Sequence, residues 1–361
     1  MIRVLVVDDS SSVRLGIRLI LESDPELTVV GEAQNGEESI TLCKTLRPDI
    51  VTMDIMMPGM GGYEAIRQIM SEAPCPIIVV TSIDSPHMVE VSFKALGLGV
   101  LTVLRKPVLL DPKNEEAQHL IQQIKTMSSV KVVRRNILLQ RPLSTTVNDI
   151  ATPAAPLRQA YLPHMRKSAR LLAIGASTGG PPALQTILSD LSPAFPIPIA
   201  VVQHISRGFV TGLAGWLSSV TPLRCKVGEH GEMIRAGIVY IAPDDNHMTV
   251  KANGMLWLDP SDPLGGHRPS VNVLFESIAK SFGKEAIGVL LTGMGKDGAR
   301  GLKAMKEAGA YTIAQDEASS VVYGMPGAAV ELNAADDILN LNLIAPWLTN
   351  LIERIMKQKE Q

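Results

Sequence analysis

The chain has 361 residues, of which 46% are apolar, and its formal net charge at pH 7 is −2. At about 150 residues per domain this length predicts two or three domains, each able to bury a core. The near-neutral charge excludes any general electrostatic reason to expect nucleic acid or an anionic membrane as partner. The three cysteines lie far apart and outside any CxxC spacing, so neither a disulfide framework nor a zinc ribbon is indicated. No apolar run approaches the ~20 residues of a membrane span, and we expect a cytoplasmic protein without membrane insertion.

The first part of the chain alternates short apolar runs with amphipathic stretches. Five runs predict β-strands, at residues 4–7, 29–33, 49–54, 76–82 and 100–104. After the first run, Val13, Ile17 and Ile20 fall on one helical face. Strands that alternate with helices are typical of a doubly wound parallel sheet, which binds its ligands at the carboxyl ends of the strands.

Polar residues stand at the ends of four of these predicted strands. They are Asp8 and Asp9 at the first, Asp54 at the third, Thr81 at the fourth and Lys106 at the fifth. Neighbouring carboxylates need a divalent cation to coexist, and Mg²⁺ suits a site made only of oxygen ligands. One carboxylate can then attack a phosphoryl donor while the amine and the hydroxyl bind the phosphoryl oxygens.

Residues 1–125 resemble the response-regulator receiver domains in the motifs VLVVDDS, DIVTMDIMMPGMGG, VVTS and LRKP. The resemblance implies a flavodoxin-like domain with a five-stranded parallel sheet. It implies that Asp54 is phosphorylated and that Asp8, Asp9 and Asp54 hold Mg²⁺. Thr81 would be the switch hydroxyl and Lys106 the amine that binds the phosphate.

Residues 126–168 predict a linker, because they are rich in small residues and proline and lack sustained periodicity. The segment and its immediate flanks are basic, with Asp149 as the acid among them. Solvated linker charge is the favoured interpretation of this basic character. An electrostatic contact with an acidic partner, or with the acidic edge of the first domain, is the alternative.

Residues 169–361 predict a second α/β domain. Its apolar runs are at residues 171–174, 198–203, 238–242, 286–293 and 311–315, mostly with helical segments between them. Asn253-Gly254 lies between two further strand-like runs and predicts a type I′ hairpin. We therefore expect a doubly wound mixed sheet that carries an antiparallel hairpin.

The stretch GASTGG, at residues 175–180, forms a turn between a predicted strand and a predicted helix. A dinucleotide fingerprint would need glycine where Ser177 stands, and a phosphate-binding P-loop would need a lysine after the glycines. The stretch does satisfy G-x-S-x-G, in which small neighbours allow a sharp turn that exposes the serine oxygen. Ser177 is therefore the candidate nucleophile.

A serine nucleophile needs a base and an acid that orients the base. His204 follows the next strand and meets Ser177 at the same sheet edge, so it is the favoured base among the seven histidines. Asp297 lies in a glycine-rich loop after a later strand and is the favoured acid; Asp244, Asp245 and Asp316 are the other candidates. The backbone amide of Met294 is a candidate oxyanion donor, with Thr178 assisting.

A second resemblance, in the motifs AIGASTGG, QHIS, YIAPDDNHM, HRPSVNVLF, LLTGMGKDGARGL and AQDEASSVVYGMPGAAVEL, is to the CheB protein-glutamate methylesterases of chemotaxis. It implies a Ser177, His204, Asp297 triad that hydrolyses glutamate methyl esters and deamidates glutamines. The partners implied are methyl-accepting chemotaxis receptors as substrates and a chemotaxis histidine kinase as phosphodonor. Mg²⁺ serves the receiver, and the esterase chemistry needs no cofactor.

The chain departs from these families at a few positions. Val103 stands where receivers usually have an aromatic switch residue, which weakens the expected link between Thr81 and surface rearrangement. In the second domain Ile205, Ser206 and Arg207 stand where the family commonly has a methionine and two prolines, and Asn272 and Gly327 replace a commonly found aspartate and arginine. None of these changes removes a member of the expected triad.

Two other functional classes are alternatives to the esterase. A receiver joined to a DNA-binding output domain would need a basic helix-turn-helix segment after the linker, where the chain has strands and glycine-rich loops instead. A receiver-controlled regulator whose second domain binds a ligand or partner without hydrolysis is the remaining alternative. It predicts that Ser177 is dispensable.

Overall fold

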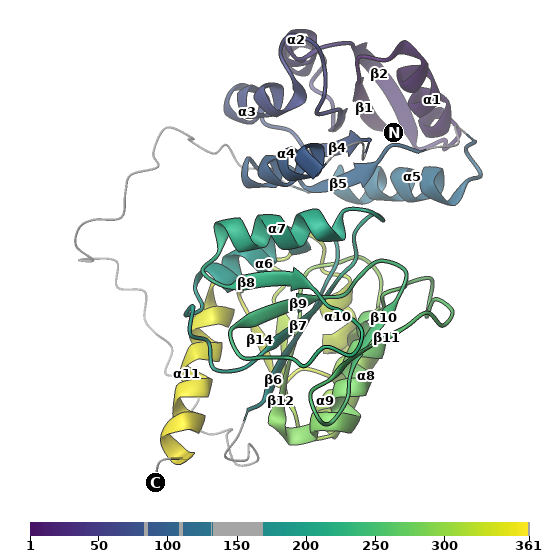
Figure 1. Ribbon diagram of the computed structural model, residues 1–361. Coiled ribbons are helices and arrows are strands. Elements are labelled where there is room, and N and C mark those ends of the chain that lie inside the picture. Colours follow the sequence, from purple (N-terminus) through teal and green to yellow (C-terminus); the bar gives the residue numbers. More distant parts are fainter. Residues whose placement is uncertain (83–85, 108–110, 131, 133–168, 360–361) are drawn as a thin grey trace, which may run out of the picture.

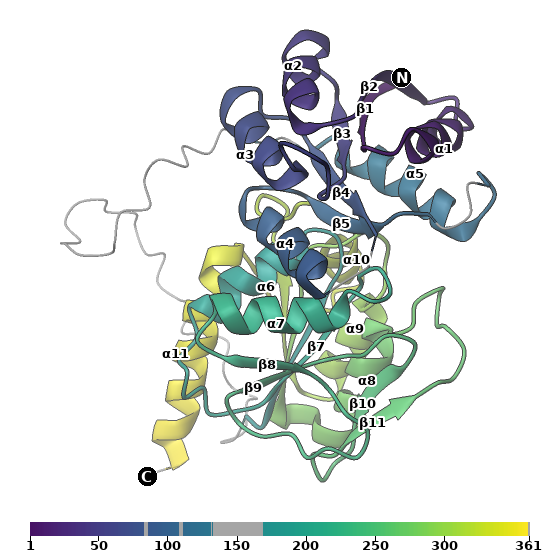
Figure 2. The same ribbon diagram turned by 45° about the horizontal axis from the view of Figure 1, so that its top comes forward.

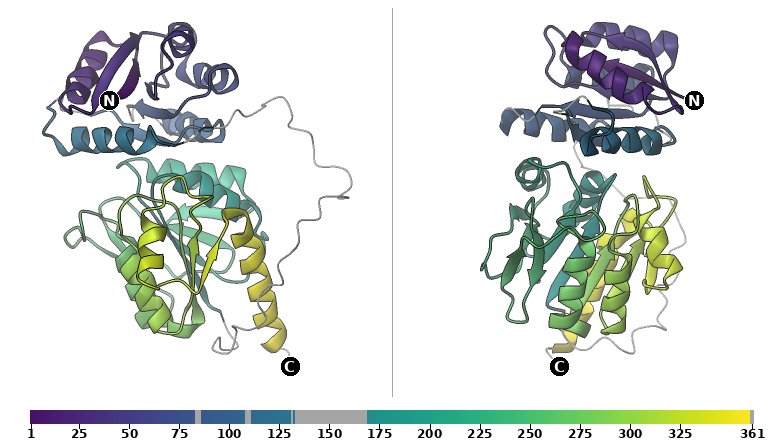
Figure 3. Two further views of the ribbon diagram at one scale, coloured as in Figure 1. Left: turned by 180° about the vertical axis from the view of Figure 1, so that it is seen from behind. Right: turned by 90° about the vertical axis from the view of Figure 1, so that its right-hand side faces the viewer.

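The computed structural model describes residues 1–82, 86–107, 111–130, 132 and 169–359. These residues form two α/β domains that lie one above the other (Figures 1 and 3). Most of the basic linker predicted at 126–168 lies outside the described residues. Among the helices of the described chain, none is long and apolar enough to cross a membrane.

The first domain is a five-stranded parallel sheet in the order β2-β1-β3-β4-β5. Its strands are β1 (Ile2–Val7), β2 (Leu27–Ala33), β3 (Ile50–Met53), β4 (Ile77–Thr81) and β5 (Thr102–Arg105). Its helices are α1 (Ser11–Glu22), α2 (Gly36–Leu46), α3 (Gly62–Glu72), α4 (Pro86–Gly97) and α5 (Glu115–Met127). The parallel sheet predicted from the alternating pattern and the flavodoxin-like fold implied by the receiver resemblance are both confirmed.

Helices cover both faces of this sheet. Ile17 and Ile20 of α1 pack with Leu120 and Ile124 of α5 against one face. Residues of α2, α3 and α4, such as Ile66, pack against the other face. Since both faces are buried, the carboxyl edge of the sheet is where polar groups can gather.

The second domain has a seven-stranded sheet in the order β14-β13-β12-β6-β7-β9-β8. These strands are β6 (Leu171–Ala176), β7 (Ile199–Gln203), β8 (Arg224–Val227), β9 (Ile238–Ile241), β12 (Ala286–Leu290), β13 (Tyr311–Gln315) and β14 (Asp337–Leu339). Every pairing within this sheet is parallel. The short edge strands β8 and β14 were not predicted from the sequence.

The helices of this domain also form two layers. They are α6 (Gly180–Ser189), α7 (Val210–Val220), α8 (Val271–Phe282), α9 (Ala299–Glu307), α10 (Met325–Glu331) and α11 (Leu341–Lys359), with a 3₁₀ turn, η1, at Gly283–Glu285. Apolar residues of α6, α7 and α11 pack on one face of the sheet, and those of α8, α9 and α10 on the other.

The predicted hairpin is present as β10 (His247–Val250) and β11 (Leu256–Asp259). It forms a sheet of its own instead of joining the larger one, so the expectation of a mixed sheet is corrected. The type I′ turn is also wrong: Gly254 has a φ of +87°, but Asn253 is not in the left-handed region. Lys251 donates to Met255, which leaves a three-residue loop with glycine at its left-handed position.

The two domains contact each other through α4 and α7, which lie side by side (Figure 2). Phe93 of α4 is fully buried, and its ring stacks on Trp216 and meets Phe209 edge-on. A Cβ atom added to Gly212 of α7 would lie 1.9 Å from Cγ1 of Val89 in α4. The glycine is therefore needed for this close approach of the two helices.

Candidate functional site

The polar residues expected at the first sheet's carboxyl edge do meet there. Asp8 and Asp54 are buried, and Nζ of Lys106 lies 2.7 Å from a carboxylate oxygen of each. Oγ1 of Thr81 donates to Oδ1 of Asp54 at 3.0 Å. Asp9 is exposed at the rim of this cluster. The ammonium group of Lys106 thus binds one carboxylate oxygen of Asp54, and the hydroxyl of Thr81 binds the other.

The three aspartates of this cluster fit a divalent cation. Asp8, Asp9 and Asp54 each offer a carboxylate oxygen, and these oxygens lie within 4.8 Å of one another. Burial raises the pKa of Asp8, against the opposing effect of Lys106. Burial would lower the pKa of Lys106, but its hydrogen bonds to Asp54 and Asp8 outweigh burial and raise the pKa. Hard oxygen donors of this kind suit Mg²⁺.

In the second domain, Ser177 lies in the turn between β6 and α6. Its amide donates to the carbonyl of Thr292, and its carbonyl accepts from Gly180. Gly179 has a φ of +76°, a conformation that few side chains allow, and it caps the helix that follows. This turn holds Ser177 at the carboxyl edge of the sheet, with its side chain partly exposed.

The side chains of His204 and Asp297 are hydrogen-bonded beside this turn. Nε2 of His204 lies 2.9 Å from Oδ2 of Asp297, and the backbone amide of His204 donates to the carbonyl of Ala176. Nδ1 of His204 is buried and has no hydrogen-bond partner within the described residues. The ring therefore has one nitrogen held by the acid and the other available to take a proton.

The Asp297 carboxylate is held by the start of α8. It accepts hydrogen bonds from the amides of Val271, Asn272 and Gly298 and from the hydroxyl of Ser270. Burial acts to raise the pKa of Asp297, but His204 and these backbone donors outweigh it and lower the pKa to about 2. Asp297 is therefore a charged acceptor at neutral pH, fixed at a helix N-terminus that favours negative charge.

Met294 and Thr178 lie close to Ser177. Thr178 directly follows Ser177, and a Cβ atom added to Gly293, the residue before Met294, would lie 2.7 Å from Cβ of Ser177. The backbone amide of Met294 makes no hydrogen bond within the described chain, as a donor to an oxyanion requires. Thr178 is buried, and its carbonyl accepts a hydrogen bond from Oγ1 of Thr292 at 2.9 Å.

Two further polar residues lie near His204 and Ser177, and the sequence predicts no role for either. The ring of His267 stacks on that of His204, with centroids 4.1 Å apart and an angle of 6° between the planes. Nε2 of Gln203 donates to the carbonyls of both Ser177 and His204, each at 2.7 Å. The position of Gln203 just before His204 was a usable signal, whereas the stacking of His267 depends on a distant loop.

Helix α5 of the first domain covers this site. Oγ1 of Thr126 and Nε2 of Gln122 approach Sδ of Met294 at 3.1 and 3.7 Å. Oγ1 of Thr178 donates to Oε1 of Gln123 at 3.5 Å. Side chains of the first domain thus touch two residues that flank Ser177.

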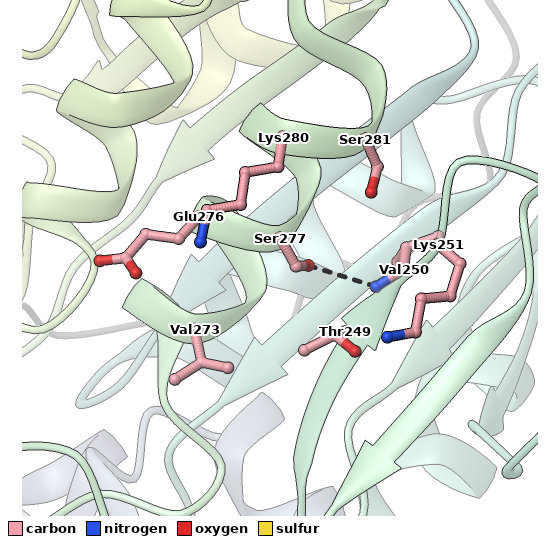
Figure 4. Close-up of a pocket in the computed structure, with 8 residues that line it drawn as sticks. All are labelled: Thr249, Val250, Lys251, Val273, Glu276, Ser277, Lys280 and Ser281. Carbon is pink, nitrogen blue, oxygen red and sulfur yellow. Dashed lines mark hydrogen bonds between the residues drawn. The ribbon is translucent and has the colours of Figure 1, made fainter.

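The alternative acids are engaged elsewhere. Asp244 accepts from the amide of Gly208, Asp245 pairs with Arg207, and Asp316 accepts from Ser319. A pocket between α8 and β10 contains none of the candidate site residues (Figure 4). Its lining includes Lys251 and Lys280, and Ser277 there accepts a hydrogen bond from the Val250 amide.

Comparisons with known proteins identify the families of the two domains. Residues 4–116 match the response regulator receiver domain family, and residues 172–348 match the CheB methylesterase family. A protein-glutamate methylesterase/protein-glutamine glutaminase 1 of Syntrophus aciditrophicus is 45% identical, over 97% of this chain and 98% of its own length. The corresponding protein of Nitrosospira multiformis is 44% identical, over 98% of this chain and 97% of its own length.

Among solved structures, the CheB methylesterase catalytic domain of Thermotoga maritima is 39% identical, with a TM-score of 0.48. The match covers 53% of this chain and 99% of the Thermotoga maritima domain. The two relatives described above, in contrast, match along almost their full length and include both domains. The chain therefore belongs to the CheB methylesterase family of chemotaxis, as a hydrolase controlled by a response-regulator receiver domain.

Proposed function

We propose that the protein hydrolyses glutamate methyl esters, and deamidates glutamines, on the signalling helices of methyl-accepting chemotaxis receptors. Ser177 is the nucleophile, His204 the base and Asp297 the acid that orients the base. The observation that carries this assignment is the hydrogen bond of 2.9 Å between Nε2 of His204 and Oδ2 of Asp297, beside the turn that presents Ser177. The full-length relatives named as methylesterases and glutaminases support the choice of substrate.

The mechanism follows from the placement of these groups. Nδ1 of His204 takes the Ser177 proton, and Oγ attacks the ester carbonyl carbon of the substrate. The Met294 amide and Thr178 stabilise the tetrahedral oxyanion, and His204 returns the proton to the departing methanol. Water activated by the same histidine then releases the carboxylate from Ser177. With glutamine, ammonia departs in place of methanol.

The receiver supplies the control. A chemotaxis histidine kinase transfers a phosphoryl group to Asp54, and Thr81 and Lys106 bind its oxygens. Bound Mg²⁺, held by Asp8, Asp9 and Asp54, would neutralise charge on the carboxylates and the phosphoryl group. Lys106 would then exchange part of its contact with the Asp54 carboxylate for the phosphate. This change biases the domain contact made by α4 and α5 towards an open state.

The function is tested by measuring methanol released from methylated receptors, with and without a small-molecule phosphodonor. We expect slow release without the donor and faster release with it. The absence of methanol in both conditions would rule out the esterase assignment and favour a regulator that binds without hydrolysis.

Asp54→Asn is expected to leave the low basal methanol release intact and to remove its stimulation by phosphodonor. The amide cannot accept a stable phosphoryl group, while the triad lies in the other domain. Methanol release and incorporation of labelled phosphate are measured together. Asp49→Asn, on an exposed carboxylate that accepts from the Arg3 amide, is the control. Stimulation that survives in Asp54→Asn would contradict the assignment.

Gly212→Ala is expected to raise the basal activity of the unphosphorylated protein. The new methyl group would overlap Val89 and force α4 away from α7. Overpacking of this kind costs about 1–3 kcal/mol, or roughly five- to a hundredfold in the ratio of open to closed forms. Gly215→Ala is the matched control on the same helix, since a Cβ there meets open space. Equal effects of the two variants would argue against closure through this contact.

A further inference from the structure

A glutamine side chain of the receiver lies against the catalytic domain next to the nucleophile. Gln123, on α5, is only 6% exposed, and its carbonyl oxygen accepts from the hydroxyl of Thr178 at 3.5 Å. Thr178 directly follows Ser177 in the chain. Helix α5 lies along the side of the first domain that faces the second domain (Figure 1). The carboxamide of one domain is thus placed at the edge of the other domain's active site.

Both ends of this carboxamide have partners. Nε2 of Gln123 lies 3.3 Å from Nε2 of His119, one turn earlier on α5. Burial lowers the pKa of His119, so its ring is neutral and can accept this hydrogen bond. With the His119 proton on Nδ1, the amide nitrogen of Gln123 donates to Nε2 of His119 while the amide oxygen accepts from Thr178. In this tautomer both groups of the carboxamide are paired, with the carbonyl towards the nucleophile turn.

The histidine partner also belongs to this site. His119 lies close enough to His267 to affect the charge of that ring, and His267 stacks on the base His204. His119 and Gln123, one helical turn apart, therefore face the catalytic histidines and the nucleophile turn respectively. Gln122, the residue before Gln123 on the helix, is exposed and contacts Sδ of Met294 at 3.7 Å.

We propose that Gln123 is a pseudosubstrate: its side chain occupies the subsite that takes the glutaminyl or methyl-glutamyl side chain of a substrate helix. The inference rests on the proposed function, in which the substrate is also a side-chain carboxamide or ester carried on a helix. Thr178 then recognises the substrate's carbonyl oxygen, as it recognises that of Gln123. In the unphosphorylated protein the receiver therefore closes the site in two ways: helix α5 covers it sterically, and the carboxamide of Gln123 mimics the side chain of a substrate.

The test separates the amide from the volume that it fills. Gln123→Met keeps the length and approximate volume of the side chain but removes both hydrogen-bonding groups. Because one net hydrogen bond changes an equilibrium about three- to tenfold, basal methanol release from the full-length, unphosphorylated protein should rise by that factor. The increase should appear as a lower apparent KM with kcat unchanged, since a pseudosubstrate competes with substrate.

Gln122→Met is the matched control on the same helix. Its weak, exposed contact with Met294 predicts less than a twofold change in basal activity. Stimulation of each variant by phosphodonor shows that its receiver is folded. Gln123→Glu is the second variant, because a carboxylate cannot donate to neutral His119, and it should also raise basal activity.

Three results would overturn the proposal. If the basal activity of the Gln123→Met variant equals that of the wild type, the volume of the side chain alone closes the site. Equal activation by Gln122→Met would show a general loosening of the domain contact, and a change in kcat alone would exclude competition. The proposed function is read separately, from methanol release by the phosphorylated wild type, which none of these results affects.

Discussion

Replacement of Ser177 by alanine is expected to abolish methanol release almost completely, by a factor of about 10⁴ or more. The turn would stay intact, because Ser177 is held there through backbone hydrogen bonds to Thr292 and Gly180. Only the oxygen that attacks the ester is lost. The measurement is methanol released per enzyme under full stimulation by phosphodonor, with circular dichroism to verify the fold.

Ser189→Ala is the control for this variant. Ser189 ends α6, the helix that begins after the nucleophile turn, and its exposed hydroxyl donates to the Val220 carbonyl. We expect wild-type activity from it. Retention of more than about a tenth of the activity in Ser177→Ala would assign the nucleophile to another group and remove the triad from the mechanism.

Asp297→Asn is expected to have the second-largest effect, a loss of about 10⁴-fold in kcat. An amide in this place cannot accept hydrogen bonds at both positions, and it would turn an N–H group towards the donors of Val271 or Asn272. His204 would lose the charge that stabilises its protonated form and fixes its orientation. Methanol release at saturating substrate gives the loss, and thermal unfolding shows any loss of stability.

The low pKa of Asp297 also predicts a pH dependence. Its value of about 2 lies below the ordinary 3.8, so the pair stabilises the fold above pH 3.8. This contribution disappears as the pH falls through about 2. Thermal unfolding should therefore be measured between neutral pH and pH 2. The unfolding temperature of the wild type should fall more over this range than that of Asp297→Asn, which has no carboxylate to protonate at this position.

Asp245→Asn is the matched control for Asp297→Asn. Asp245 has a φ of +59°, which asparagine tolerates, and its side chain pairs with the exposed Arg207. We expect less than a twofold change in activity. An active Asp297→Asn, or an equally inactive Asp245→Asn, would contradict the role given to Asp297.

The sequence alone determined the fold class and the residues that stand at the strand ends. Strand alternation brings Asp8, Asp54 and Thr81 to one edge whatever the rest of the fold does, because parallel strands share a carboxyl edge. The same rule placed Ser177 and His204 after the neighbouring strands β6 and β7. These are local properties of the chain, which is why periodicity and turn residues sufficed to predict them.

Contacts between distant segments could be decided only by the tertiary structure. The hairpin remained outside the main sheet because β10 packs on α8, and its turn took three residues, not two. Ser270 and the backbone amides of Val271 and Asn272 bind Asp297 although they precede it by 25 to 27 residues in the sequence. The ring of His267 stacks on that of His204. Gln123 contacts Thr178 across a sequence separation of 55 residues, which includes the predicted linker. Such contacts depend on how whole elements pack, and no local pattern in the sequence records that packing.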